Sequence, residues 1–510
     1  MSPSESFKSQ ARPQQDPKPT DAIMERIFEK APTLARLGDA SSLASYMAPA
    51  FEWQASPDTF PYRKDLQTRI VNETARLHGA ETAAKIDAQL SRHFTVETGP
   101  HLSLPRDQDR VALPASAEDN VNTLIFQGTV VSAAAHKKAG DDIHLSFVTG
   151  RVTGSNPNSA RYFQPAAGQA LTVIGSKYIS NSPQNFIPAI NEERLAELDK
   201  ELKKMGPSLT EADQNRAQRF MANMRKHPDS LRDQVAVAHS DLMTEVLSSA
   251  GMSQCTLEYE EVARDMFIDM LDDPRSLLHR IFSDPVLRES FINDFSNIGT
   301  GWKQGETPFD VIGTKKGITR VEGNYDGDLS PATLKEKIRS REIMPKGALI
   351  YFTFIAEAGL LPLGGMFQTT YCTALRDRSV PLLQKMGDHQ RAEAVAQMPT
   401  HIATVSPAWG LTSADGQTHM TTYGDALSGK CQLTQKTLDD VMNLSGKTAL
   451  LTSALCLHNF LVEEEDLKIG DDQKTLLLAE IAHQGDAIQF TSAEPAARRQ
   501  PQAGYKNTPQ

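Results

Sequence analysis

The strongest candidate for a catalytic residue is His101, in the first of three polar loops. The stretch TGPHLSLP places it directly after a predicted strand, in a loop over residues 99–106. A histidine can exchange protons near neutral pH or donate a hydrogen bond to an oxyanion. The alternative is a loop histidine that hydrogen-bonds only the backbone. We predict that His101 is catalytic.

A predicted helix follows this loop and brings two polar side chains close to it. Asn122 lies in its first turn, near the positive end of the helix dipole, and Gln127 lies further along. A ligand anion at such an end is stabilised by roughly 0.3 to 1 kcal/mol. The alternative is that Asp119 or Asn120 simply caps the helix. We predict that Asn122 and Gln127 bind substrate.

The second polar loop, GRVTGSNPNSARYF, follows the next predicted strand. Its glycines permit close backbone approach, its arginines carry fixed positive charge, and its Asn and Ser side chains donate and accept hydrogen bonds. A long Asn/Gly turn is the alternative. It lacks the GxxxxGK[ST] spacing of a phosphate-binding P-loop. The residues predicted to bind substrate here are Arg151, Asn156, Ser159 and Arg161.

The third loop, GLLPLGGMFQTTY, has a Gly-Gly pair at the start of a predicted helix. Gly364 and Gly365 would let a ligand approach the backbone, and the helix amino end attracts negative charge. Gln368 and Tyr371 would project one turn into the helix. The alternative is a tight loop that needs glycine for its geometry. We predict that these four residues bind substrate.

Motifs for metal binding and for other well-known chemistries are missing. The histidines are scattered, with neither HExxH nor HxH, so the sequence predicts no metal site. No CxxC pair, GxSxG elbow or evident catalytic carboxylate pair occurs. The cofactor requirement is therefore unknown. The scattered residues are His136, His144, His401, His419 and His458, with Cys255, Cys372, Cys431 and Cys456.

The helices and strands predicted around these loops indicate an α/β fold. Short apolar runs before the loops predict strands, and apolar residues at three- and four-residue spacing predict helices. Such sheets bind ligands at the carboxyl ends of their strands. We predict an open, mostly parallel sheet with a large helical insertion and a helical C-terminal part. The predicted parts are a disordered tail (1–20), an α/β core with N-terminal helices (21–190), a helical insertion (191–305), a second part completing the core (306–493) and a disordered tail (494–510).

Several finer features are predicted outside the loops. The alternation and glycines over residues 307–321 predict a hairpin. A helix is predicted over Ser330 to Arg341, with Pro331 at its first position. Ser208, three residues before Glu211, predicts a capping box.

Composition narrows the class of protein. The 510 residues carry a formal net charge of -11, which argues against general nucleic-acid binding. No apolar run reaches the roughly 20 residues that span a bilayer. Dispersed cysteines suit a reducing compartment. We therefore expect a soluble, cytoplasmic protein with a small-molecule partner and without nucleic-acid or membrane partners. Its oligomeric state stays open, and the polar N-terminal stretch is also compatible with a secretion signal.

Two stretches of this sequence resemble parts of the bacillithiol-forming cysteine-adding enzymes. TGPHLSLP with its following helix, and LPLGGMFQTTY, occupy places comparable to the Gly-His loop and the late Gly-Gly segment of that family's nucleotidyltransferase-like core. The Gly-His-Gln order of the family is Gly99, Pro100, His101 here, and the later acidic His-containing stretch of the family has no counterpart. The resemblance implies that His101, Gly364 and Gly365 line a site where a small polar substrate is joined to an amine or acyl partner.

The functional prediction is an enzyme of small-molecule biosynthesis, of secondary-metabolite or thiol/amine type, acting as a ligase or transferase on a small polar substrate. The alternative is a non-catalytic interaction protein or secreted effector. The enzyme interpretation requires that the three loops meet in space, because ligand sites of α/β folds are single concave pockets.

Overall fold

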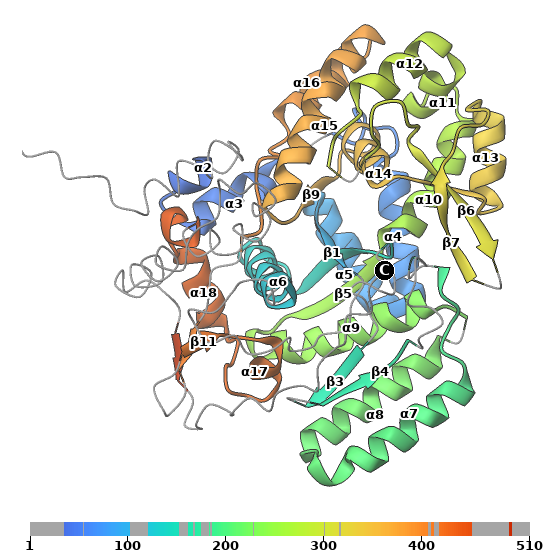
Figure 1. The fold of residues 1–510 in the computed structure, drawn as a ribbon. Coiled ribbons are helices and arrows are strands. Elements are labelled where there is room, and N and C mark those ends of the chain that lie inside the picture. Colours follow the sequence, from blue (N-terminus) through green and yellow to red (C-terminus); the bar gives the residue numbers. More distant parts are fainter. Residues whose placement is uncertain are drawn as a thin grey trace, which may run out of the picture.

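A parallel sheet of four strands lies at the centre of the molecule, in the order β5-β2-β1-β9 (Figure 1). Its strands are β5 (Ser253–Glu258), β2 (Ile143–Thr149), β1 (Thr95–His101) and β9 (Leu361–Leu363). The computed structural model describes residues 35–54, 56–101, 121–151, 162–166, 169–174, 183, 186–227, 229–299, 301–315, 318–405, 410–412, 418–450 and 489–491. The predicted α/β class with a mostly parallel sheet is confirmed.

The register of the sheet brings the four carboxyl ends to one edge. Glu97 of β1 lies opposite Ser146 of β2 and Leu363 of β9. The pairing of β2 with β5 runs without interruption from Ile143–Ser253 to Val148–Glu258. All three pairings are parallel, so the loops after β1, β2, β5 and β9 leave from the same edge.

Helices cover both faces of the sheet, as a parallel sheet requires. On one face, α6 (Val121–Lys138) connects β1 to β2, and its Ser132 hydroxyl lies 3.0 Å from His144 Nε2 of β2. On the same face, α9 (Leu231–Leu247) leads to β5. On the other face, Thr74 of α4 (Arg63–His78) contacts Cys255 of β5. The two preceding helices of the chain are α2 (Ala35–Gly38) and α3 (Leu43–Glu52), and α5 (Ala80–Arg92) leads into β1.

The region predicted as a helical insertion, residues 191–305, is mostly helical and also supplies β5 to the central sheet. Its first two helices pair at one end of the molecule, beside the antiparallel strands β3 (Tyr162–Ala166) and β4 (Gln169–Thr172) (Figure 1). The helices of the region are α7 (Glu192–Met205), α8 (Glu211–Lys226), α9, α10 (Tyr259–Asp272), α11 (Leu277–Ser283) and α12 (Pro285–Asp294), with single 3-10 turns at Gly206–Ser208 and Ser248–Ala250.

The predicted capping box at Ser208 is wrong. Helix α8 is capped by Thr210, whose side chain accepts a hydrogen bond from the backbone N–H of Asp213. The Ser208 hydroxyl instead donates to the Met205 carbonyl, at 2.7 Å, inside the preceding 3-10 turn. A side-chain hydroxyl does cap the helix, as the preferences for N-cap residues predict, but it belongs to Thr210 and not to Ser208.

A second sheet, in the order β7-β6-β8, lies to one side of the core (Figure 1). Strands β6 (Phe309–Lys315) and β7 (Ile318–Asn324) form an antiparallel hairpin, which confirms the hairpin predicted over 307–321. Helix α13 (Pro331–Arg339) begins at Pro331, as predicted, and β8 (Ile343–Pro345) returns to pair with β6.

The C-terminal part is largely helical around β9. Its described residues include α14 (Gly347–Thr353), a π-helical turn (Phe354–Ala358), α15 (Met366–Lys385), α16 (His389–Gln397), α17 (Tyr423–Leu427) and α18 (Gln435–Asn443), with the small sheet of β10 (Gly410–Thr412), β11 (Thr418–Met420) and β12 (Gln489–Thr491). One apolar cluster of buried side chains joins these helices to the central sheet.

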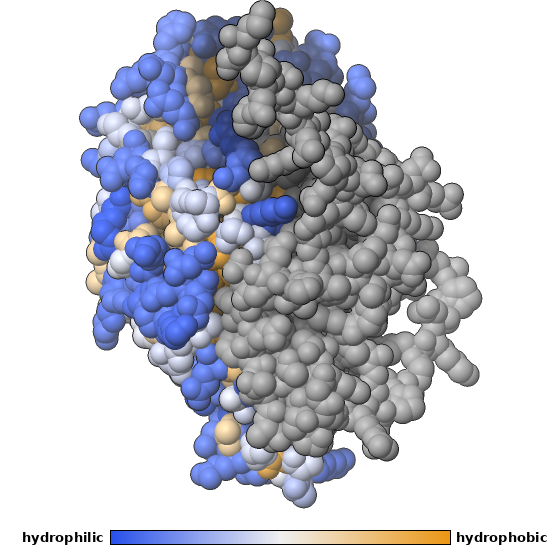
Figure 2. All heavy atoms as spheres, turned by 90° about the vertical axis from the view of Figure 1, so that its left-hand side faces the viewer, coloured by the Kyte–Doolittle hydropathy of each residue, from blue (hydrophilic) through white to orange (hydrophobic). Residues whose placement is uncertain are grey.

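On the face that Figure 2 shows, the described surface is mostly hydrophilic, and its apolar residues form only small patches. Val286, at 69% exposure, is the one large apolar side chain that the described residues expose strongly. Among the described helices, none combines the length and apolar composition that spanning a bilayer requires.

Candidate functional site

The starts of the three predicted loops lie next to one another at the carboxyl edge of the central sheet. His101, the last residue of β1, is paired with Thr149, the last residue of β2. Leu363, the last residue of β9, is paired with Glu97 on the other side of β1, so Gly364 leaves the sheet beside Thr98. Ligands of open α/β sheets bind at this kind of edge.

A hydrogen bond joins the ends of β1 and β9. The amide nitrogen of Gln368, in the first turn of α15, donates to the Thr98 hydroxyl, and both side chains are buried. Gly364 makes this contact possible, because a Cβ atom there would lie 1.9 Å from Gln368 Oε1 and 2.6 Å from the Thr98 carbonyl oxygen. Gly364 is therefore required by packing, whereas Gly365 is exposed and a Cβ there would meet nothing within 4 Å.

Three tyrosines continue the polar row from Gln368 toward β5. The ring centroids of Tyr371 and Tyr351 are 5.4 Å apart, and those of Tyr351 and Tyr259 are 5.8 Å apart. They come from α15, α14 and the start of α10, so three distant segments of the chain supply them. Gly299 leaves room for the row, since a Cβ there would lie 2.7 Å from the Tyr371 ring.

Two buried carboxyl groups end the row at β5. The Thr149 hydroxyl donates to Glu260 Oε1, at 2.5 Å, and the Gly150 N–H donates to Glu260 Oε2, at 3.3 Å. Glu258 accepts the backbone N–H groups of Glu260 and Glu261, both at 3.1 Å, and so caps α10. The whole row, which we call the carboxyl-edge cluster, comprises Thr98, Thr149, Glu258, Tyr259, Glu260, Tyr351, Gln368 and Tyr371.

Burial sets the protonation of this cluster. It raises the pKa of Glu258 well above the usual range, and the neighbouring Glu260 carboxyl raises the pKa of Glu258 further. Burial likewise raises the pKa of Tyr351 and Tyr371, so both phenols keep their protons and act as hydrogen-bond donors. Burial also raises the pKa of the Cys372 thiol well above its usual range, which suits a small buried side chain rather than a nucleophile.

Arg151 was predicted to hold a ligand anion and has protein partners instead. Its guanidinium donates to the carboxylate of Asp310 in β6 and to the carbonyl of Pro345 in β8. It therefore fastens the end of β2 to the second sheet. Anion binding by Arg151 stays a prediction, and these contacts leave less of its guanidinium free for it.

Gln127 points away from the carboxyl-edge cluster. It is buried on α6, and its amide nitrogen donates to the Thr421 carbonyl, at 3.2 Å, just before α17. Asn122 lies in the first turn of α6 and His101 ends β1, but the side chains of both lie outside the described part of the structure. Asn156, Ser159 and Arg161 also lie outside the described residues.

The sequence reasoning missed both carboxyl groups of the cluster, Glu258 and Glu260, and two of its three tyrosines, Tyr259 and Tyr351. Glu258 and Glu260 occur in SQCTLEYEE, where a short apolar strand ends directly in acids. The local pattern does not reveal the strand, because apolar residues recur at helical spacing from Leu257 to Leu271 and α10 begins directly after β5. Tyr351 gave no signal, because it lies within an uninterrupted apolar run that reads as core.

The cluster combines the groups that acid/base chemistry needs. A pair of carboxyl groups in unequal environments can divide the roles of acid and base. Protonated phenols can donate to an oxygen on which negative charge develops. Comparison with known proteins adds no name to this arrangement, since no protein-family model and no curated protein matches the chain.

Proposed function

We propose that the protein is an enzyme that transfers or ligates a group on a small polar substrate at the carboxyl edge of the central sheet. The observation that carries the proposal is the carboxyl-edge cluster itself, a row of buried and half-buried polar side chains connecting the ends of all four parallel strands. Burying so many polar groups costs stability unless they are well paired, and such groups concentrate at functional sites.

In this proposal Glu260 removes a proton from the attacking group of the substrate. Its two oxygens accept hydrogen bonds from Thr149 and Gly150, which orient the carboxyl group at the strand end. Tyr351 and Tyr371 donate to the acyl oxygen that becomes negative as the attacking group adds to its carbon. When this adduct collapses, the bond to the leaving group breaks and Glu260 passes its proton to that group. His101, at the end of the neighbouring strand, is a second candidate for acid or base.

The test begins with a thermal-shift screen of the full chain against nucleotides, amino acids and amino sugars, because a ligand of the native state raises the melting temperature. Pairs of hits are then incubated together, and product is measured by mass spectrometry. Glu260→Gln and Tyr371→Phe are compared with Tyr46→Phe, a buried phenol that bonds the His401 carbonyl outside the cluster.

We expect Glu260→Gln to lower turnover by about 100-fold or more, in the range typical for loss of a general base. Tyr371→Phe should lower it by about tenfold or more, since one oxyanion donor is lost. Tyr46→Phe should leave turnover unchanged. Equal turnover in all four proteins would reject the proposal and favour a non-catalytic interaction protein.

A further inference from the structure

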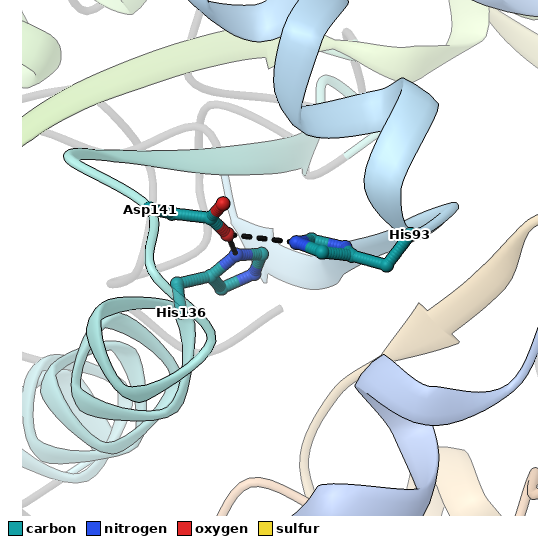
Figure 3. Close-up of side chains that lie close together, drawn as sticks. All are labelled: His93, His136 and Asp141. Atoms are coloured by element: carbon teal, nitrogen blue, oxygen red, sulfur yellow. Dashed lines mark hydrogen bonds and ion pairs between the residues drawn. The ribbon is translucent and has the colours of Figure 1, made fainter.

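A second buried cluster lies at the opposite, amino edge of the sheet (Figure 3). His93 directly precedes β1, His136 lies in the last turn of α6, and Asp141 lies in the connection to β2. His93 Nε2 and His136 Nδ1 are each 2.8 Å from the same oxygen, Asp141 Oδ2. All three side chains are at least 97% buried, since their exposed fractions are 3%, 0% and 0%.

We propose that His93, His136 and Asp141 bind one divalent transition-metal ion, such as Zn²⁺. Two imidazole nitrogens and one carboxylate oxygen are a donor set that zinc, cobalt and iron share. The three ligand atoms already lie within 4.8 Å of one another. With metal–ligand bonds of about 2.0 to 2.1 Å, tetrahedral ligand atoms lie roughly 3.3 Å apart. The two N···O separations therefore need to open by only about half an ångström.

Two neighbouring side chains support the site. Arg92, which is half exposed, donates to Asp141 Oδ1 and so directs Oδ2 between the two rings. Partners of this kind hold a ligating carboxylate in place. The Gln89 amide lies 3.2 Å from His136 Nδ1. Because the oxygen and nitrogen of an amide exchange by a half-turn, Gln89 can present its carbonyl oxygen as a fourth ligand.

The hydrogen bonding of the cluster also converges on a single point. The other ring nitrogens, His93 Nδ1 and His136 Nε2, have no hydrogen-bond partner among the described residues. Both rings therefore direct one nitrogen to the shared Asp141 oxygen, and Gln89 lies beside that nitrogen of His136. The Phe51 ring stands edge-on to both, with centroid distances of 4.9 and 5.0 Å, and keeps the point apolar on one side. An ion held there would experience little competition from water.

The proposed role is structural rather than catalytic. The ligands join the end of α5, the end of α6 and the start of β2, whereas the carboxyl-edge cluster lies at the other end of the strands. Binding of an ion to the native chain but not to the unfolded chain raises stability by mass action. The site does not depend on the proposed enzymatic function, and each can fail without the other.

The experiment titrates Co²⁺ into the full chain after purification with a chelator. Calorimetry measures the affinity, and visible absorption reports the coordination of the ion. We expect one Co²⁺ per chain, ligand-field bands of nitrogen and oxygen coordination, and a rise in melting temperature of about 2 °C or more. His136→Asn should weaken binding by about 100-fold or more, since a ligand is lost. His389→Asn, at an exposed histidine, should change nothing.

Gln89→Glu separates a metal site from a purely hydrogen-bonded cluster, and it decides the question if His136→Asn does not fold. A second carboxylate beside Asp141 should destabilise the metal-free protein by like-charge repulsion and tighten Co²⁺ binding by about tenfold or more. Three results would each overturn the proposal. They are the absence of Co²⁺ binding when one equivalent is added, a Co²⁺ affinity that Gln89→Glu does not change, and equal losses of Co²⁺ affinity in His136→Asn and His389→Asn.

Discussion

At the scale of single residues, Glu97 shows how burial changes an ordinary side chain. It lies in the middle of β1, is 2% exposed, and its carboxyl oxygen is 3.4 Å from His144 Nε2. Burial raises its pKa to about 8, and the nearby hydroxyls of Ser146 and Thr129 reduce this effect only in part. The folded protein therefore keeps the carboxyl group protonated at a pH where the unfolded chain ionises it.

This shift predicts how stability depends on pH. Because the folded-state pKa is raised above the ordinary 4.5, the contribution of Glu97 to stability is complete below pH 4.5 and is lost as the pH rises to about 8. In Glu97→Gln this loss should be absent. As the pH rises, the unfolding free energy of the variant should therefore increase relative to that of the wild type, by up to about 1.4 kcal/mol per pH unit. Urea unfolding at pH 5, 7 and 9 measures it.

The comparison between the two proteins isolates Glu97. Burial also lowers the pKa of His144 to about 3, but this residue is present in both proteins, so its contribution largely cancels in the difference. Glu81→Gln, at a side chain that is 85% exposed, is the control and should show no such trend. A difference between Glu97→Gln and wild type that does not vary with pH would contradict the prediction.

At the scale of elements, two adjacent glycines at the junction of β9 and α15 lie in different environments. Gly364 lies where Gln368 and the backbone of β1 leave no room for a side chain. Gly365 has φ of -62° and is the N-cap residue of α15, in open space. The Gly-Gly motif therefore contains one residue that packing requires and one that a ligand could approach.

We expect Gly364→Ala to destabilise the protein by about 1 to 3 kcal/mol, because the new methyl group overpacks against the Thr98 carbonyl. Gly365→Ala, its matched control, creates no close contact and should cost less, about 0.5 to 1 kcal/mol, because alanine is a poorer N-cap than glycine. Urea unfolding of both variants measures the difference. Equal effects would mean that the close approach at Gly364 is relieved at little cost by movement of Gln368.

At the scale of the whole molecule, Arg151 connects two sheets that the chain forms more than 150 residues apart. Its contacts to Asp310 and Pro345 join the carboxyl end of β2 to the β7-β6-β8 sheet. Lys346, directly after β8, pairs with Glu306 at 2.9 Å and so ties β8 to the segment before β6 within the second sheet. The carboxyl edge of the central sheet is thus bordered by the second sheet, and the two must hold together for the edge to keep its shape.

Loss of this connection should loosen the second sheet without unfolding the first. We predict that Arg151→Ala increases amide hydrogen exchange over residues 309–324 and leaves exchange in β2 and β5 unchanged. A double-mutant cycle with Asp310→Ala should give a coupling energy of about 1 to 3 kcal/mol, typical of a charge-assisted hydrogen bond that is partly buried. Arg320→Ala, on β7 near Glu322 at 3.8 Å, is the control and should have little effect.

Local patterns explain which elements could be predicted from the sequence. The α13 start at Pro331, the hairpin over 307–321 and the parallel strand before His101 each depend on residues close together in the chain. Strand β9 has three residues, and β5 reads as the start of a helix, so neither carries a reliable local signal. Their identity depends on pairing with β1 and β2, which lie more than 100 residues away.

The same division applies to the candidate site. Hydrophobic periodicity and glycine positions are local properties, so the α/β class and the loops at the strand ends could be predicted from the amino-acid sequence. The meeting of Glu258, Glu260 and Tyr351 with Gln368 and Tyr371, and of two histidines with an aspartate at the other edge, could not. Which polar groups share one buried place is set by strand order and register, and these depend on the packing of the whole chain.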